Sequence, residues 1–160
     1  MKIELINEYN IDIASIIFSE SWQYSHKGIV TRKFCSSFTP ERQKGVLQQH
    51  IEKGNKCFVG FKNHKPVGIL ILDYDSNELV SIYISPDFLY KGYGSQLITF
   101  ALDKLDSGRE IYLIVMNVNK DARRFYEKFG FQFCGKTKIL SIEKGLSELT
   151  YVYRGLFDIV

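Results

Sequence analysis

The stretch IYISPDFLYKGYGS, residues 82–95, decides the fold, because an apolar strand there runs through a glycine-containing loop directly into the start of a helix. Gly92 and Gly94 permit backbone conformations, and a close approach to the backbone, that a side chain would prevent. A helix that begins there leaves its first N–H groups without partners in the helix and points the positive end of its dipole toward the loop. The stretch therefore predicts a site for an anion such as a pyrophosphate.

Two well-known nucleotide-binding patterns do not fit this loop. The third glycine of a dinucleotide-binding fingerprint would fall at Leu97, and the preceding strand comes from a hairpin. No Gly-Lys-Ser/Thr sequence follows, which excludes a Walker loop. Because two spaced glycines can equally mark an ordinary turn, the interpretation needs support from a second segment.

That second segment is NVNKDARRFYEKFGF, residues 117–131, which follows another apolar strand. Its pattern predicts an amphipathic helix that Asn119 caps and Gly130 ends, with Phe125 and Phe129 packed in the core. Tyr126 would bring a phenol to the edge of that core, and a phenol can protonate a departing thiolate.

Outside these two segments, hydrophobic periodicity and turn residues set the remaining elements. Ile13, Ile16 and Ile17 are spaced as on a helix, and Thr39 followed by Pro40 marks the start of another. In order, we expect a strand near 2–6, helices over 11–24 and 40–53, strands at 57–61, 66–74 and 79–84, a helix over 94–107, a strand over 111–116, a helix over 120–129, and strands within 131–140 and 148–156. This order predicts an α/β (α+β) fold with a mixed, mostly antiparallel central sheet of about seven strands, flanked by about four helices.

Composition places the chain among soluble globular proteins. It has 160 residues, 45% of them hydrophobic, and we expect one domain over residues 1–160. No apolar run approaches the roughly 20 residues of a membrane span, and the charged N-terminus does not resemble a signal peptide, so we expect a cytoplasmic protein without membrane contact. The three cysteines suggest neither a disulfide framework nor a metal site, and a net charge of +3 does not favour nucleic acid.

With both segments quoted, the chain resembles the GCN5-related N-acetyltransferase (GNAT) superfamily over nearly its whole length. LYKGYG at 89–94 is similar to the family's pyrophosphate loop, Gln/Arg-x-x-Gly-x-Gly/Ala, and 119–131 is similar to its Asn-x-x-Ala-x-x-Phe/Leu-Tyr-Glu-x-x-Gly-Phe segment. Ser21-Trp22 and Gly28-Ile29 also resemble a segment from one branch of the family. The resemblance implies the family fold, acetyl-CoA as acyl donor, no metal, and direct attack by an amine in a ternary complex.

The resemblance also implies roles for individual residues. The pyrophosphate would lie on Tyr90, Lys91, Gly92, Tyr93, Gly94 and Ser95, the pantetheine arm on the backbone of Ile82, Tyr83 and Ile84 and on Asn119, and Tyr126 would be the general acid. The backbone N–H groups of the same strand would suit the oxyanion. We expect the first helix and its following loop, with Glu20, Trp22, Tyr24 and His26, to cover the acceptor side. There the aromatic rings of Trp22 and Tyr24 could pack on the acceptor, and the Glu20 carboxylate could attract its amine.

Several alternatives stay open at this stage. In the pyrophosphate loop, Leu89 replaces the family's Gln or Arg. Ile114 stands where some members have a Glu that acts as the general base, so the base here would be Glu78, or Asp73 acting through water. Trp22 could simply be a core residue and His26 an ordinary surface histidine. A CoA-binding regulatory domain without turnover is the alternative function, nucleic-acid binding is a weaker one, and a homodimer is compatible with the sequence.

Overall fold

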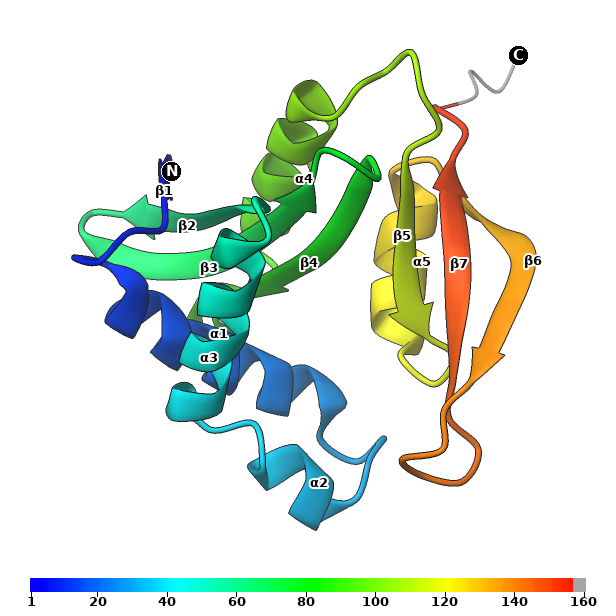
Figure 1. The fold of residues 1–160 in the computed structure, drawn as a ribbon, viewed down its shortest axis with the longest axis horizontal. Coiled ribbons are helices and arrows are strands. Elements are labelled where there is room, and N and C mark those ends of the chain that lie inside the picture. The colour runs from blue at the N-terminus through cyan, green and yellow to red at the C-terminus, as the bar shows by residue number, and fades with distance from the viewer. Residues whose placement is uncertain (157–160) are drawn as a thin grey trace.

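A computed structural model describes residues 1–156, which form one seven-stranded sheet with helices on both faces (Figure 1). In chain order the elements are β1 (Lys2–Leu5), α1 (Ile11–His26), α2 (Arg32–Ser36), α3 (Pro40–Glu52), β2 (Lys56–Lys62), β3 (Lys65–Asp73), β4 (Glu78–Ile84), the 3-10 turn η1 (Pro86–Phe88), α4 (Tyr93–Lys104), β5 (Tyr112–Met116), α5 (Lys120–Lys128), β6 (Phe131–Ile139) and β7 (Ser147–Tyr153). The strand order is β1-β2-β3-β4-β5-β7-β6, with β4 and β5 parallel and the other neighbours antiparallel. The predicted mixed, mostly antiparallel sheet is confirmed. Within residues 1–156, no helix is long and apolar enough to cross a membrane.

One face of the sheet is covered by α1 and α3, whose buried side chains pack on the side chains of β2 and β3. The helix α1 was predicted, but its buried face was only partly identified. Ile17 is buried, whereas Ile13 and Ile16 are 39% and 44% exposed. The buried face instead includes Ile11, Ala14, Phe18 and Trp22, which follow one another at intervals of three or four residues and so lie on one side of the helix.

The opposite face is covered by α4 and α5, and its core includes Leu97 and Tyr126 from these helices. The end of α5 is confirmed at Gly130, which has a φ of +94°. A Cβ there would lie 2.5 Å from the carbonyl oxygen of Gly155, so both the backbone angle and the close contact require glycine.

The short helix α2 was not predicted, since five residues are too few to show a helical period. The side chain of Thr31 caps it, with Oγ1 accepting the N–H of Phe34 at 3.2 Å. The predicted cap of α3 is confirmed, because Oγ1 of Thr39 accepts the N–H of Arg42 at 3.2 Å.

The sheet separates into two parts between β4 and β5. Their pairing consists of Glu78 with Tyr112 and Leu79 with Leu113, and beyond these pairs the two strands diverge (Figure 1). On its other side β4 has a bulge: Ser81 and Leu79 pair with consecutive β3 residues, so Val80 has no partner of its own. Because bulges bend a strand, this one accounts for the divergence at the middle of the sheet.

Candidate active site

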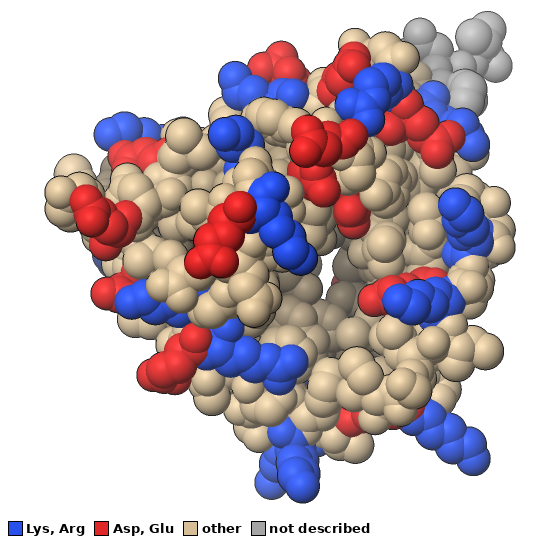
Figure 2. Space-filling view, viewed as in Figure 1, with Lys and Arg blue, Asp and Glu red and all other residues tan. Residues whose placement is uncertain are grey.

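The diverging strands enclose a cavity of about 1180 Å³. Its walls come from the end of α1, residues 80–84 of β4, the loop before α4, β5 and the start of α5. Figure 2 shows the corresponding hollow near the middle of this face, with mostly uncharged atoms inside it and Lys, Arg, Asp and Glu side chains around it. The two sequence segments that carried the resemblance therefore meet at one site.

One wall of the cavity is the free edge of β4. The N–H of Ser85 donates to the carbonyl of Val67 on β3 at 2.7 Å. Since such bonds alternate along an antiparallel pair, the backbone groups of Tyr83 also face β3, whereas those of Ile82 and Ile84 face the cavity. Of the three residues expected to use their backbone, Tyr83 is therefore placed differently, and it lines the cavity with its side chain.

A second wall is the start of α4. Gly92 has a φ of +84° and precedes the first helical residue, as the predicted anion site requires. The N–H of Gln96 donates to the carbonyl of Gly92 at 3.2 Å, which leaves the N–H groups of Tyr93, Gly94 and Ser95 as the helix donors without an acceptor one turn back. Gly92, Gly94 and Ser95 all line the cavity.

The other three loop residues expected at the pyrophosphate differ in position. Tyr90 lines the cavity, but its side chain is 95% exposed and its φ is +59°. Lys91 and Tyr93 do not line the cavity: the Lys91 ammonium donates to the carbonyl of Asp87 at 2.8 Å, and the Tyr93 ring packs edge-on against Phe88. In this structure Tyr93 can bind an anion through its backbone N–H rather than through its ring.

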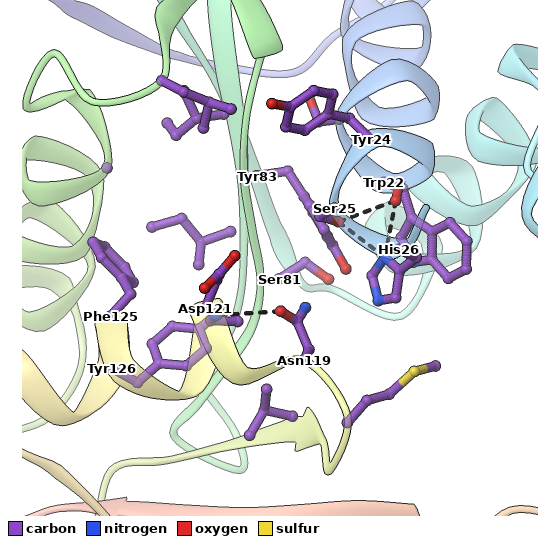
Figure 3. Close-up of a pocket in the computed structure, with 18 of the residues that line it drawn as sticks. Trp22, Tyr24, Ser25, His26, Ser81, Tyr83, Asn119, Asp121, Phe125 and Tyr126 are labelled. Atoms are coloured by element: carbon purple, nitrogen blue, oxygen red, sulfur yellow. Dashed lines mark hydrogen bonds between the residues drawn. The ribbon is translucent and has the colours of Figure 1, made fainter. Parts of the chain in front are cut away.

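The third wall carries Asn119 and Tyr126 (Figure 3). Asn119 caps α5 as predicted, with Oδ1 accepting the N–H of Ala122 at 3.2 Å, and this bond fixes its side chain at the cavity. Tyr126 is 8% exposed and its ring packs against Phe125. Burial raises the pKa of Tyr126, and the neighbouring phenol of Tyr83 raises it further, so both hydroxyls keep their protons at neutral pH.

On the α1 side, the structure brings Trp22 and Tyr24 to the cavity but not Glu20. Trp22 is also a core residue, since it is 7% exposed and its ring stacks on Phe38 with centroids 3.4 Å apart. Tyr24 is 55% exposed at the cavity edge, and Glu20 is exposed to solvent outside the lining.

His26 was expected on the acceptor side, with an ordinary surface histidine as the alternative, and the structure excludes the surface position. Its side chain is 3% exposed, because it packs beneath Trp22 and near Tyr83, and it lines the cavity. The surface alternative is wrong because α1 runs two residues past its expected end and carries the ring inward. Its place four residues after Trp22, on the same side of the helix, was the signal that could have identified it.

Neither carboxylate suggested as general base reaches the cavity lining. Glu78 accepts the hydroxyl of Tyr112 at 3.2 Å, and burial raises the pKa of its carboxyl. Asp73 accepts the N–H groups of Asp75 and Ser76 in a turn, and although burial opposes them, these bonds hold its pKa low. Ile114 does line the cavity, and so does Glu148 from β7, which sequence reasoning missed.

Taken together, the cavity offers unpaired backbone donors along β4, a helix start that suits a phosphate group, and a protonated phenol at their junction. Such an arrangement can bind an extended phosphorylated ligand, stabilise an oxyanion and protonate a leaving group. Among residues 1–156, no group of His, Cys, Asp and Glu side chains suited to holding a metal ion is found.

Residues 16–131 match the model of the Acetyltransferase (GNAT) family. None of the curated proteins compared matches the chain. Among solved structures, PaiA N-acetyltransferase from Thermoplasma acidophilum in complex with coenzyme A superposes with a TM-score of 0.74 and 21% identity, over 96% of this chain and 100% of that one.

Two further structures are similar over nearly the full length of both chains. An acetyltransferase from Thermus thermophilus gives a TM-score of 0.69 with 23% identity, over 98% of each chain. The apo-form of YjaB from Escherichia coli gives 0.73 with 20% identity, over 97% of this chain and 98% of that one. These similarities confirm the fold that the order of elements predicted.

Proposed function

Since the chain belongs to the GNAT acetyltransferase family, we propose that residues 1–160 form one catalytic domain, which transfers the acetyl group of acetyl-CoA to an amine of a small molecule or a peptide. The observation that carries the proposal is the cavity between β4 and β5, where backbone donors, the start of α4 and the Tyr126 phenol converge. The free cysteines Cys35, Cys57 and Cys134 fit a reducing compartment such as the cytoplasm.

The residues of the cavity fit coenzyme A in two places. The N–H groups of Tyr93, Gly94 and Ser95 would receive the pyrophosphate, helped by the dipole of α4. The backbone of Ile82 and Ile84 and the side chain of Asn119 would hold the pantetheine arm between the diverging strands. Leu89 supplies no polar side chain for the phosphates, which leaves their binding to backbone donors.

The transfer itself needs three actions from the protein. The neutral amine attacks the thioester carbonyl, and N–H groups of β4 stabilise the oxyanion that forms. When the carbon–sulfur bond breaks, Tyr126 donates its proton to the departing thiolate and recovers one that the amide nitrogen releases. The products are the acetylated amine and coenzyme A, and no covalent acyl-enzyme is formed.

The acceptor would enter from the α1 side. The proposed coenzyme A contacts lie along β4, the start of α4 and the start of α5, whereas Trp22, Tyr24 and Glu148 line other parts of the cavity. The aromatic rings can pack on the body of the acceptor, and the Glu148 carboxylate can attract its ammonium group. This placement assigns the cationic attraction to Glu148 rather than to Glu20, which lies outside the lining.

The proposal is tested by calorimetry with acetyl-CoA, followed by measurement of free thiol release in the presence of a panel of small amines and peptides. We expect 1:1 binding and thiol release that depends on the added amine. Binding without release for any amine would instead support a CoA-binding regulatory domain. The sequence feature that favours this alternative is Ile114 on β5, which stands where some family members have a Glu that acts as the general base. Absence of binding would contradict both functions.

A further inference from the structure

His26 is a buried imidazole in the cavity wall that the proposed function does not yet use. It is the last residue of α1, and its side chain is 3% exposed. Despite this burial it borders the cavity, together with Ser25 and Tyr83 (Figure 3). Neither Asp73 nor Glu78 lines the cavity, and its carboxylates, Glu148 on β7 and Asp121 on α5, come from other walls than the α1 side on which the acceptor is expected to enter.

Hydrogen bonding defines which nitrogen of His26 carries the proton. Nδ1 lies 2.8 Å from the carbonyl oxygen of Trp22 and 2.9 Å from Oγ of Ser25. A carbonyl oxygen can only accept, so Nδ1 must be the nitrogen that bears hydrogen. In a neutral imidazole the other nitrogen, Nε2, then has a free lone pair, and it points away from the α1 backbone into the cavity (Figure 3).

The surroundings of His26 hold the ring in place and keep it neutral. Its ring stacks on that of Trp22, with centroids 3.9 Å apart and an angle of 11° between the planes, and Phe38 stacks on Trp22 in turn. Burial lowers the pKa of His26, and the bond to the Trp22 carbonyl offsets only part of this effect. At neutral pH the ring is therefore an unprotonated base with a fixed orientation.

We propose that Nε2 of His26 is the general base that takes a proton from the acceptor's ammonium group. This inference rests on the proposed acetyl transfer. The ammonium nitrogen loses one proton to Nε2, giving the neutral amine that attacks the thioester. The nitrogen releases a second proton as the amide forms, which balances the proton that the thiolate receives, and His26 later gives its proton to solvent.

Other ionisable groups face His26 from several elements. Lys27 follows it directly, just after the end of α1. Tyr83 on β4 has its ring centroid 6.4 Å away, and it is uncharged because burial raises its pKa. Glu148 on β7 shares the cavity, where its carboxylate would favour the incoming ammonium group. Across the cavity, α5 contributes a mixed set, Lys120, Asp121 and Lys128.

The test is His26→Asn, which keeps a donor near the position of Nδ1 for the Trp22 carbonyl but removes Nε2. The matched control is His50→Asn, because His50 is a half-buried histidine on α3 whose Nδ1 is bonded to Asn55 and which lies outside the cavity. Both variants are assayed with the amine that the wild-type protein acetylates fastest in the panel above, from pH 5 to 10, and their acetyl-CoA affinities are measured by calorimetry.

For the wild-type protein and the control, kcat/KM should rise with pH and level off below pH 7, since His26 has a lowered pKa. For His26→Asn we expect a loss of about 100-fold or more at pH 7, unchanged acetyl-CoA affinity, and a profile that keeps rising toward the pKa of the amine. A purely structural role would lower activity without moving the profile.

The outcomes separate this inference from the proposed function. If His26→Asn keeps the wild-type rate and pH profile with an amine that both proteins acetylate, the base assignment is wrong and acetyl transfer stands. If the wild-type protein acetylates no amine in the panel, acetyl transfer is contradicted and the base role falls with it. Nitrogen NMR of the wild-type ring gives a second check, because a proton found on Nε2 rather than Nδ1 at pH 7 would also overturn the assignment.

Discussion

Gly94 lies against the ring of Phe125, so closely that a Cβ on the glycine would be 3.3 Å from two of the ring carbons. This contact joins the first turn of α4 to α5, and both residues line the cavity. The spacing between the proposed pyrophosphate site and the proposed pantetheine and acid residues is therefore set by direct packing of the Phe125 ring on Gly94.

The loop before α4 gives the first prediction. Gly92→Val should weaken acetyl-CoA binding by more than about tenfold, because the side chain would block the close approach to the backbone and strain a φ of +84°. Gly54→Val is the matched control, since Gly54 has a φ of +90°, open space around it and no part in the cavity. Calorimetry on the folded proteins decides, and equal affinities would remove the pyrophosphate from this loop.

Tyr126→Phe gives the second prediction, because it keeps the ring and deletes the proton donor. We expect kcat to fall by about 10²- to 10⁴-fold with little change in acetyl-CoA affinity. Tyr153→Phe, at a half-buried tyrosine outside the cavity, should leave kcat unchanged. Steady-state kinetics with a fixed amine checks both variants, and a wild-type rate for Tyr126→Phe would exclude this residue as the acid.

The hydrogen bonds between Thr31 and Glu143 give the third prediction. The Glu143 carboxylate accepts the N–H of Thr31 at 3.2 Å and also its hydroxyl, which ties the loop before α2 to the β6–β7 loop. Glu143→Ala should speed hydrogen exchange in residues 140–146 by about fivefold, whereas Lys144→Ala in the same loop should not. If the amide hydrogens of residues 140–146 exchange at the same rate in the two variants, the hydrogen bonds to Thr31 do not stabilise the loop.

The buried His26 also makes stability depend on pH, which is the fourth prediction. Its folded pKa lies below 6.5, so the unfolded chain binds the proton first as the pH falls. The free energy of unfolding should therefore be highest above about pH 6.5 and should decrease below it. The decrease should be smaller for His26→Asn, while His50, whose pKa burial also lowers, keeps its contribution in both proteins. Urea denaturation at pH 5 and 7.5 measures the free energy of unfolding of both proteins. An equal decrease between the two pH values for the wild-type protein and for His26→Asn would contradict a neutral buried ring.

Much of the fold could be predicted from the sequence, because its signals are local. The cap at Thr39, the stop at Gly130 and the strand expected at 79–84 each depend on signals within a few residues, and each is confirmed. The helix α2 was missed since its five residues show no period. The spacing of Ile13 and Ile16 predicted the helix but not their exposure, because which side of α1 is buried depends on packing against distant strands.

The site was predicted where it depends on motifs and missed where it depends on tertiary packing. Gly92, Asn119 and Tyr126 reach the cavity, as the two segments indicated, although their roles stay predictions. Glu148 could not be predicted, because its position depends on β7 pairing beside β5, and the burial of His26 was missed because it depends on where α1 ends.

The central claim is that this cavity transfers an acetyl group from acetyl-CoA directly to an amine. The most direct measurement uses acetyl-CoA labelled in the acetyl group and follows both the label and the free thiol in a single turnover. We predict that label appears on the amine in an amount equal to the thiol released, with none on the protein. Label that stays on bound acetyl-CoA in the presence of every amine tested, or that moves to a cysteine of the chain, would contradict the account.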